Sequence, residues 1–362
     1  MLTRFRQPQS QVLPPAPTLQ KRPAYTAPNA EVRWQWHQQF GYNPSSLGAL
    51  SAEIFEQSGI AGGLPYHAAG RVWIGTGDPL CAPTEQAELL RAFVGQARRL
   101  GKVAILLPVT ARLAAVAAPL GFTAVCLGAT PYLELQSWSP AGNSGKMLRD
   151  NLNAARRLGI QLEIAPLEGT EPTPAFRAEC AALMGSWQTS RRAGTLLSWV
   201  FELDPFGWSA GKRYFLARDA GGQAVVFLSA SPLPARGGWY LEDFIRHPNT
   251  PSGAAAALAA YALAHLTESG ASLATLGAVP LCLPRRPEPQ AASSATLEAL
   301  LYAARPLLSR WYNFDGLRQF KNQFRPSFWE NEYLLLPSKS ALPSAALGLL
   351  RATLPGGLRT LG

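Results

Sequence analysis

Short apolar runs alternate with amphipathic segments along most of this chain, and Gly or Pro marks many of the junctions. In the first half, the apolar runs predict strands at residues 71–75, 102–108, 122–127, 132–136 and 160–164. Apolar positions at helical spacing, with Pro or Gly near the ends, predict helices at residues 83–100, 111–118 and 145–158. We expect ordered sequence to begin near residue 31.

A similar succession follows in the second half. Strands are predicted at residues 213–218, 224–230, 239–245, 272–276 and 334–336, with a hairpin turn at Gly221-Gly222. Helices are predicted at residues 174–187, 252–267 and 296–308. Because helices alternate with strands and adjacent strands form hairpins, we expect an α/β fold with mixed sheets, built as two halves that meet near residues 160–172.

The composition excludes several classes of protein. Of the 362 residues, 47% are hydrophobic, which is enough for a sizeable core and too many for a disordered chain. The four cysteines are far apart and the four histidines form no HxH or HExxH pair, so we expect neither a disulfide scaffold nor a metal centre. The start lacks the apolar region of a signal peptide, and no apolar stretch reaches the ~20 residues that span a bilayer. We therefore expect a cytoplasmic protein.

The charge is basic and unevenly distributed. Lys and Arg number 33 against 23 Asp and Glu, a net charge of +10 that favours an anionic partner, either nucleic acid or an anionic membrane. Residues 1–30 hold four basic residues and no acid, residues 333–362 hold three and no acid, and +3 therefore remains for residues 31–332. With a Leu-rich patch at 345–354, these ends are expected to favour peripheral association with the inner face of the membrane.

A short polar turn, Gly77-Asp78-Pro79, lies where a predicted strand meets a predicted helix. Gly permits positive φ and Asp accepts hydrogen bonds from helix amides, which favours a structural turn near a site. Familiar catalytic motifs are missing from the sequence: it has no GxSxG, no GxxxxGK[ST] and no GxGxxG after a strand. The acyl-CoA pyrophosphate loop, [RQ]xxGxG/A, begins at Arg191-Arg192-Ala193-Gly194 but is not completed.

The helix predicted at 145–158 is basic. Lys146, Arg149 and Asn153 are three and four residues apart, so they share one face. Such a face suits phosphate binding, and a solvated helix face accounts for it equally well.

The strand predicted at 239–245 contains an unusual carboxylate. Alternation along the strand places Leu241 and Asp243 on one face, which puts the acid among apolar neighbours. A buried carboxylate needs a partner, and Arg246 is the nearest candidate. Three residues apart on a regular strand, the two side chains meet only if the strand ends or bulges between them. A structural ion pair and a catalytic pair both remain open.

Near the end of the chain, residues 313–333 interleave aromatic and basic side chains. Phe320 and Phe324 are four residues apart and are expected to pack inward together. Arg318, Lys321 and Arg325 are expected to form a second stripe, which suits a phosphate-bearing ligand or single-stranded nucleic acid. A packed aromatic helix with a solvated basic edge is the structural alternative.

In order along the chain, these motifs resemble those of one known family. The first half contributes Phe40-Gly41-Tyr42, Tyr66, VWIGTGDP at 72–79 and KMLRDNLNAARRLG at 146–159. The second half contributes DFIR at 243–246, LGAVPL at 276–281, and FDGLRQFK at 314–321 with Phe324, Pro326 and Trp329. Over about residues 35–337, the chain resembles the C-terminal catalytic domain of the phosphatidylglycerol lysyltransferases, the multiple peptide resistance factor family.

The resemblance implies a tandem pair of GNAT-like acyltransferase folds. We accordingly expect a basic Pro-rich arm at 1–30, GNAT-like domains at 31–165 and 166–337, and a basic tail broken by Pro and Gly at 338–362. It also implies transfer of an amino acid from aminoacyl-tRNA to the hydroxyl of a lipid such as phosphatidylglycerol, without a cofactor, and neither the amino acid nor the oligomeric state follows from the sequence.

The resemblance carries site residues with it. The family's DxxR pair falls on Asp243 and Arg246, which are expected to be catalytic. The remaining basic residues are expected to hold tRNA or lipid phosphates: Lys146, Arg149, Arg318, Lys321 and Arg325. The second lysine of the family's basic stripe is replaced here by Gln323. An acyl-CoA-dependent N-acyltransferase, a non-catalytic module that binds tRNA or membranes, and an enzyme with a different lipid or peptide acceptor are the alternatives.

Overall fold

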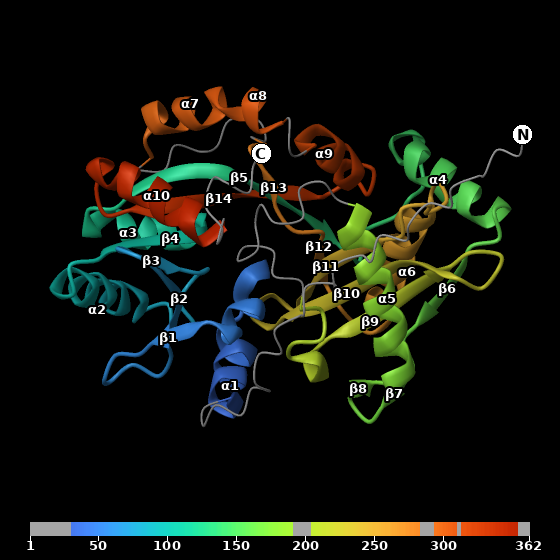
Figure 1. Cartoon of the computed structure of the whole chain (residues 1–362), viewed down its shortest axis with the longest axis horizontal. Helices are drawn as coiled ribbons and strands as arrows, with labels where there is room; N and C mark the ends of the chain where they lie inside the picture. The colour runs from blue at the N-terminus through green and yellow to red at the C-terminus, as the bar shows by residue number, and fades with distance from the viewer. Residues whose placement is uncertain (1–29, 191–203, 283–292, 310–312, 354–362) are drawn as a thin grey trace, which may run out of the picture.

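The computed structural model describes residues 30–190, 204–282, 293–309 and 313–353. Its main feature is one mixed sheet of twelve strands, ordered β1-β2-β3-β4-β14-β5-β12-β11-β10-β9-β6 with β13 beside β5 (Figure 1). These strands are β1 (Glu53–Phe55), β2 (Leu64–Ala69), β3 (Val72–Gly75), β4 (Val103–Thr110), β5 (Thr123–Glu134), β6 (Gln161–Ile164), β9 (Arg213–Arg218), β10 (Ala224–Leu233), β11 (Gly238–Arg246), β12 (Leu273–Thr275), β13 (Val279–Pro280) and β14 (Phe328–Leu336). The short β7 (Leu167–Glu168) and β8 (Glu171–Pro172) pair separately.

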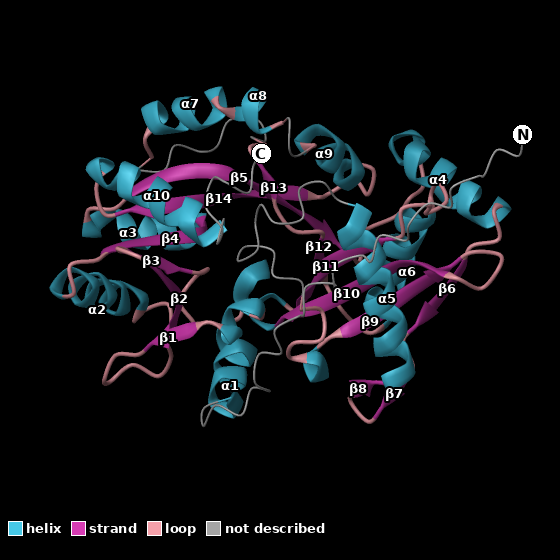
Figure 2. Ribbon diagram, in the orientation of Figure 1, coloured by secondary structure: helices cyan, strands magenta, loops and turns pink. Residues whose placement is uncertain are grey.

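Helices pack around this sheet, as Figure 2 shows. They are α1 (Ala30–Phe40), α2 (Gln86–Arg99), α3 (Ala111–Ala117), α4 (Lys146–Arg157), α5 (Pro174–Ser190), α6 (Ala254–Glu268), α7 (Ala295–Ala303), α8 (Arg305–Leu308), α9 (Phe314–Asn322) and α10 (Leu342–Thr353). Five predicted helices, from 83–100 to 252–267, are confirmed with shifted ends, and the one at 296–308 is divided into α7 and α8. The α/β class with a mixed sheet is also confirmed.

The two halves contain the same unit. In the first, β2 and β3 form an antiparallel hairpin, and α2 then carries the chain to β4, which is parallel to β3. In the second, β10 and β11 form the hairpin, and α6 leads to β12, which is parallel to β11. This hairpin followed by a β-α-β crossover is the repeat that the tandem fold requires.

Strands cross between the halves. The last strand, β14, lies between β4 and β5 and is antiparallel to both, so the end of the chain completes the first half. In return, the end of β5 pairs with β12 of the second half. The predicted strands at 122–127 and 132–136 are therefore one strand, and the predicted strand at 334–336 is nine residues long, because each gains a partner from the other half.

The C-terminal region differs from the expected broken tail. Residues 342–353 form α10, whose Ala345 is fully buried against strands of the first half. Two sequence features lie outside the described residues: the Pro-rich arm, apart from its last residue, and the Arg191–Gly194 segment.

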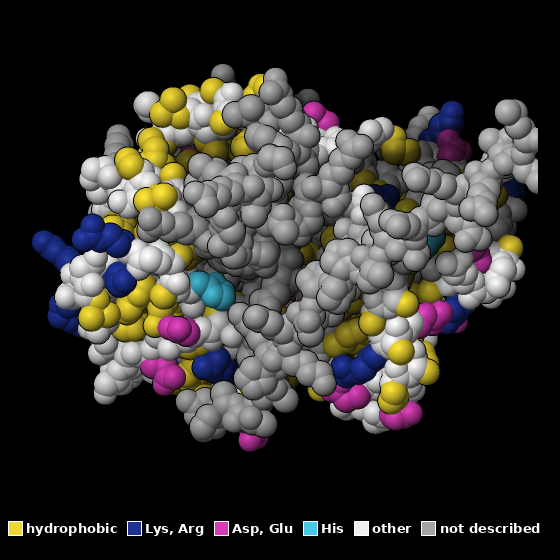
Figure 3. Space-filling view, viewed as in Figure 1, with side chains coloured by type: hydrophobic (Ala, Val, Ile, Leu, Met, Phe, Trp, Pro, Cys, Tyr) yellow, Lys and Arg dark blue, Asp and Glu magenta, His cyan; other side chains and the backbone are white. Residues whose placement is uncertain are grey.

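The outer face of α7 carries no charge. Its one acidic residue, Glu298, is turned inward, where the carboxylate accepts a hydrogen bond of 3.0 Å from the amide of Cys126. Leu300 on the opposite side is 61% exposed, and hydrophobic side chains gather over α7 at the top of Figure 3. Within the described ranges, no helix is both long and apolar enough to cross a membrane.

Because β14 completes the first half, shortening a buried side chain of this strand should cost much stability. Leu335 is fully buried among side chains of the first half, and Leu335→Ala should lower the free energy of unfolding by about 2–5 kcal/mol. Leu300→Ala, at an exposed position, should change it by less than about 0.5 kcal/mol. Urea unfolding of both variants checks this, and equal losses would show that β14 does not pack as described.

Candidate active site

A β-bulge interrupts the pairing of β10 with β11. Leu228 pairs with Phe244 and Ala230 pairs with Leu241, so the single residue Ser229 lies opposite both Glu242 and Asp243. The extra residue shifts the alternation of side chains along β11. The prediction that Leu241 and Asp243 share a face is therefore wrong: Leu241 packs with Phe244 in the core beneath α6, and Asp243 points to the other side.

The bulge gathers a polar cluster on this other side, which we call the bulge cluster: Lys212, Ser229, Ser231, Glu242 and Asp243. The Ser229 hydroxyl donates to Asp243 Oδ2 at 3.0 Å, and the Ser231 hydroxyl donates to Glu242 Oε2 at 2.5 Å. The buried Lys212 ammonium lies 3.0 Å from the same Glu242 oxygen. Sequence reasoning missed this cluster, although two serines at alternate positions of an otherwise apolar strand are a signal that could have found it.

The pKa of the Asp243 carboxyl is raised to a value near neutral pH. Removal from solvent raises the pKa of its carboxyl to about 7, and the neighbouring Glu242 charge acts in the same direction. The Lys212 ammonium and the Ser229 hydroxyl oppose this shift. A half-buried carboxyl with a pKa near 7 can both accept and return a proton at physiological pH.

Arg246 does not pair with Asp243. Residues 244–246 pair in regular register with residues 228–226, so the bulge, which Glu242 and Asp243 form, does not lie between the two side chains. The interpretation as a structural ion pair is therefore wrong. Arg246 is exposed and borders a hollow of about 460 Å³, which we call the Arg246 hollow. Its lining residues are Asn151, Trp187, Ser190, Arg246, His247, Pro248, Thr250, Pro251, Ser252, Gly253, Ala255, Ala256, Phe320 and Gln323.

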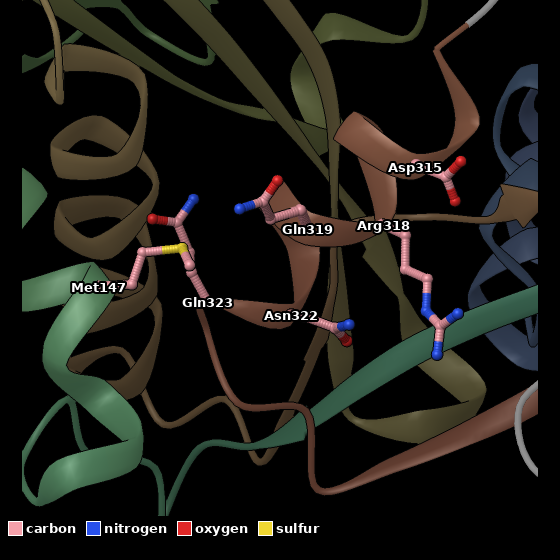
Figure 4. A pocket seen from close by; sticks show the side chains of 6 residues that line it. All are labelled: Met147, Asp315, Arg318, Gln319, Asn322 and Gln323. Atoms are coloured by element: carbon pink, nitrogen blue, oxygen red, sulfur yellow. The ribbon is translucent and has the colours of Figure 1, made fainter.

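The two basic segments, far apart in the sequence, meet in space. The Asn151 amide of α4 donates to the Gln323 side-chain carbonyl beside α9 at 2.7 Å. Near this contact, Arg318 borders a second hollow of about 350 Å³, the Arg318 hollow, with Met147, Asp315, Gln319, Asn322 and Gln323 (Figure 4). Gln323 lines both hollows, which therefore adjoin.

Lys321 departs from the predicted basic stripe. Its side chain is buried and its ammonium donates to the carbonyls of Gly277 and Ala278 at 2.7 and 2.8 Å. Burial lowers the pKa of Lys321 to about 7, against the opposing effect of the Glu332 carboxylate. Phe320 and Phe324 do pack together as predicted, with ring centroids 5.5 Å apart.

Two other basic residues shape a loop. Arg149 Nη1 donates to the carbonyls of Pro140 and Gly142 at 2.7 and 2.5 Å. Arg325 Nη1 donates to the carbonyls of Ser139 and Ala141 at 3.2 and 2.6 Å. Lys146 and Arg318 are exposed at the surface of the same region.

Asp78 belongs to the interior of the first half. Its carboxylate accepts from the Thr110 amide at 2.9 Å and from the Thr110 hydroxyl at 2.6 Å, and burial raises its pKa. Thr110 in turn caps α3 by accepting from the amide of Leu113. Gly77, with φ of +77°, leaves room for the Asn43 and Ser45 side chains beside this turn.

The sequence did not indicate one further charged contact, an ion pair between Arg236 and Glu330 where the two halves meet. Arg236 forms a bidentate pair with Glu330 at 2.7 and 2.8 Å. Its guanidinium lies over the rings of Tyr132 and Tyr42, at 4.0 and 4.6 Å from their centroids. This contact joins the segment after α1, β5 and β14 to the turn of the second hairpin.

Comparison with known proteins identifies one matching family and several structures with a similar fold. The family model described as "Phosphatidylglycerol lysyltransferase, C-terminal" matches residues 53–336. Among solved structures, L-PGS from Bacillus licheniformis superposes with a TM-score of 0.71 at 20% identity, covering 89% of this chain and 95% of that one. The C-terminal domain of a putative lysylphosphatidylglycerol synthetase from Agrobacterium fabrum also gives 0.71 at 20% identity, with 92% and 98% coverage.

A conserved protein of unknown function from Bacteroides thetaiotaomicron is a more distant structural neighbour. It gives a TM-score of 0.55 at 14% identity, with 85% of this chain and 90% of that one covered. At these identities the neighbours show the fold. Comparison with curated proteins found no match.

The pKa of Asp243 predicts a pH dependence of stability. The folded pKa of about 7 lies above the ordinary value of about 4, so the stabilisation from the bound proton is full at low pH and is lost as pH rises through 7. Asp243→Asn removes this loss, so its stability relative to wild type should rise between pH 5 and pH 8. Urea unfolding across this range measures it, with Asp219→Asn on the β9–β10 turn as control. A difference from wild type that does not change with pH would contradict the assigned pKa.

Proposed function

The chain belongs to the family of phosphatidylglycerol lysyltransferase C-terminal domains, and we propose that it transfers an amino acid from aminoacyl-tRNA to the hydroxyl of an anionic phospholipid such as phosphatidylglycerol. Membership makes a transferase of the lysylphosphatidylglycerol synthase type the starting point. The observation that carries the proposal further is the half-buried Asp243, which has a pKa of about 7 and lies at the bulge of β11.

The chemistry requires little more than position and proton transfer. The aminoacyl ester of a charged tRNA is already activated, so a bound acceptor hydroxyl can attack its carbonyl carbon directly. Asp243 takes the proton of that hydroxyl as the new ester bond forms. The bond to the terminal ribose oxygen then breaks, and this oxygen receives the proton. Ser229, which donates to Asp243 Oδ2, holds the carboxylate in place for both transfers.

The basic residues divide into two groups. Arg246, Lys146 and Arg318 are exposed and are assigned to phosphates of the donor or of the lipid headgroup. Arg149, Lys321 and Arg325 already donate to backbone carbonyls, and their role is to fix the loop at 139–142 and the turn at 277–278. These three residues are therefore proposed to position the loop and the turn and not to bind substrate.

The acceptor also requires access to a lipid surface. The outer face of α7, with its exposed Leu300 and inward Glu298, can rest against a bilayer without burying a charge. Peripheral contact through this face is part of the proposal.

Asp243→Asn should lower the rate of transfer about 10²–10³-fold, because the amide cannot accept the hydroxyl proton. The measurement supplies radiolabelled aminoacyl-tRNAs and phosphatidylglycerol vesicles to the full chain and counts label in the extracted lipid. Asp219→Asn, on the exposed β9–β10 turn, should retain wild-type activity. Transfer by Asp243→Asn within a few-fold of wild type would remove the proton-acceptor role.

Salt dependence separates the two groups of basic residues. Arg318→Ala removes an exposed phosphate contact, so the slope of log K for tRNA against log salt concentration should become shallower by about 1. Lys321→Met removes a buried ammonium that is bonded to Gly277 and Ala278, and it should leave the slope unchanged. An equal change of slope in both variants would place Lys321 at the tRNA surface.

A further inference from the structure

We propose that the Arg246 hollow receives the 3′-terminal nucleotide of the donor tRNA, with the nucleotide's phosphate on Arg246 and its base between the aromatic walls. This inference rests on the proposed function, since it assumes that tRNA is the donor. The 3′ end of the tRNA carries the aminoacyl ester, so this end must reach the bulge cluster, and the Arg246 hollow is where it binds.

The hollow has the size and walls of a nucleotide site. Its volume of about 460 Å³ is within the range of about 300–1,000 Å³ that small-molecule sites occupy. Trp187 from α5 and Phe320 from α9 supply aromatic surface, and a flat base can stack on such side chains. Ser252, Gly253 and Ala255 form another wall with small side chains, which leaves the backbone accessible.

The electrostatics favour an anion. Arg246 is exposed, none of the residues lining the hollow is acidic, and no ion pair holds its guanidinium among the described residues. The guanidinium can therefore bind a phosphate through two parallel hydrogen bonds. The first turn of α6 also borders the hollow; its Ala254 amide donates to the Pro251 carbonyl at 3.2 Å, and the N-cap Gly253 provides no side chain to cap the next amides.

The path to the hollow fits a single strand. The Arg318 hollow adjoins it through Gln323, so a chain of nucleotides can pass the exposed Arg318 before it reaches Arg246. At this junction the Asn151 amide donates to Gln323 and the Gln323 amide donates to the Phe320 carbonyl, which leaves the Asn151 side-chain oxygen to accept from a base. Cations spaced along a groove with aromatic platforms are the usual means of binding unpaired nucleotides.

The position relative to Asp243 suits the reaction. Arg246 and Asp243 lie on the same strand, and three residues of strand span about 10 Å. A terminal phosphate on Arg246 therefore places the ribose and its aminoacyl ester within reach of the bulge cluster. The two side chains point to opposite sides of β11, and within the described residues β12 pairs with β11 only at 238–240, so the substrate passes the edge of β11 between Arg246 and Asp243.

Binding of uncharged tRNA tests this without any transfer reaction. The full chain is titrated with a tRNA that ends in CCA and with the same tRNA lacking the terminal adenosine. Wild type should bind the complete tRNA about tenfold more tightly, the contribution expected of one stacked base. Ser252→Trp fills the hollow from an exposed position, and Arg246→Ala removes the phosphate contact.

Both variants should reduce the tenfold preference to nearly one, and Ser252→Trp should leave the affinity for the shortened tRNA unchanged. Ala181→Trp, at an exposed position of α5 outside the hollow, should keep the preference. Equal binding of the two tRNAs by wild type, or a preference that survives Ser252→Trp, overturns the assignment. Displacement of the complete tRNA by coenzyme A, competing in the hollow at micromolar concentration, would also overturn it in favour of an acyl-CoA donor.

The proposed function is tested separately by the transfer assay. If no aminoacyl-tRNA yields labelled lipid while the preference and its loss in Ser252→Trp are both observed, the proposed transfer fails and the nucleotide site stands.

Discussion

The pairing of β5 on both of its edges is the constraint on which the rest of the structure depends. Along most of its length β5 pairs with β14 from the end of the chain, and its last residues pair with β12 from the second half. Buried backbone N–H and C=O groups must find partners, so neither half satisfies this strand alone. The halves therefore form one sheet, in which β12 pairs with β5 on one side and with residues 238–240 of β11 on the other.

The charged contact at the junction follows from this arrangement. Burying a guanidinium is costly unless it is paired, and Arg236 meets that requirement with the bidentate Glu330 of β14 and the faces of Tyr42 and Tyr132. One partner comes from each crossing strand, since Tyr132 lies on β5 and Glu330 on β14. Arg236 lies two residues before the start of β11, so the same contact holds the turn from which the strand with the bulge begins.

Sequence patterns predicted what depends on local chemistry and failed where long-range pairing decides. Helix positions and the β9–β10 hairpin follow from periodicity and Gly221-Gly222, and the structure confirms them. The length of β14 depends on partners more than 190 residues away, which no local pattern reveals. Likewise, the spacing of Phe320 and Phe324 correctly predicted that they pack together, but helical spacing alone could not show that Lys321 turns inward to two carbonyls. The domain boundaries at 165 and 337 stay a prediction.

The regular strand after the bulge accounts for how Asp243 and Arg246 could serve the two proposed tasks. An arginine paired with Asp243 would stabilise the carboxylate and lower its pKa, leaving a poor proton acceptor at neutral pH. Because the strand is regular after the bulge, Arg246 and Asp243 point to opposite sides of β11. The carboxyl can then keep its raised pKa of about 7 beside Ser229, while the guanidinium stays available for a phosphate. The spacing of three residues on a regular strand thus keeps the carboxylate and the guanidinium of the motif apart.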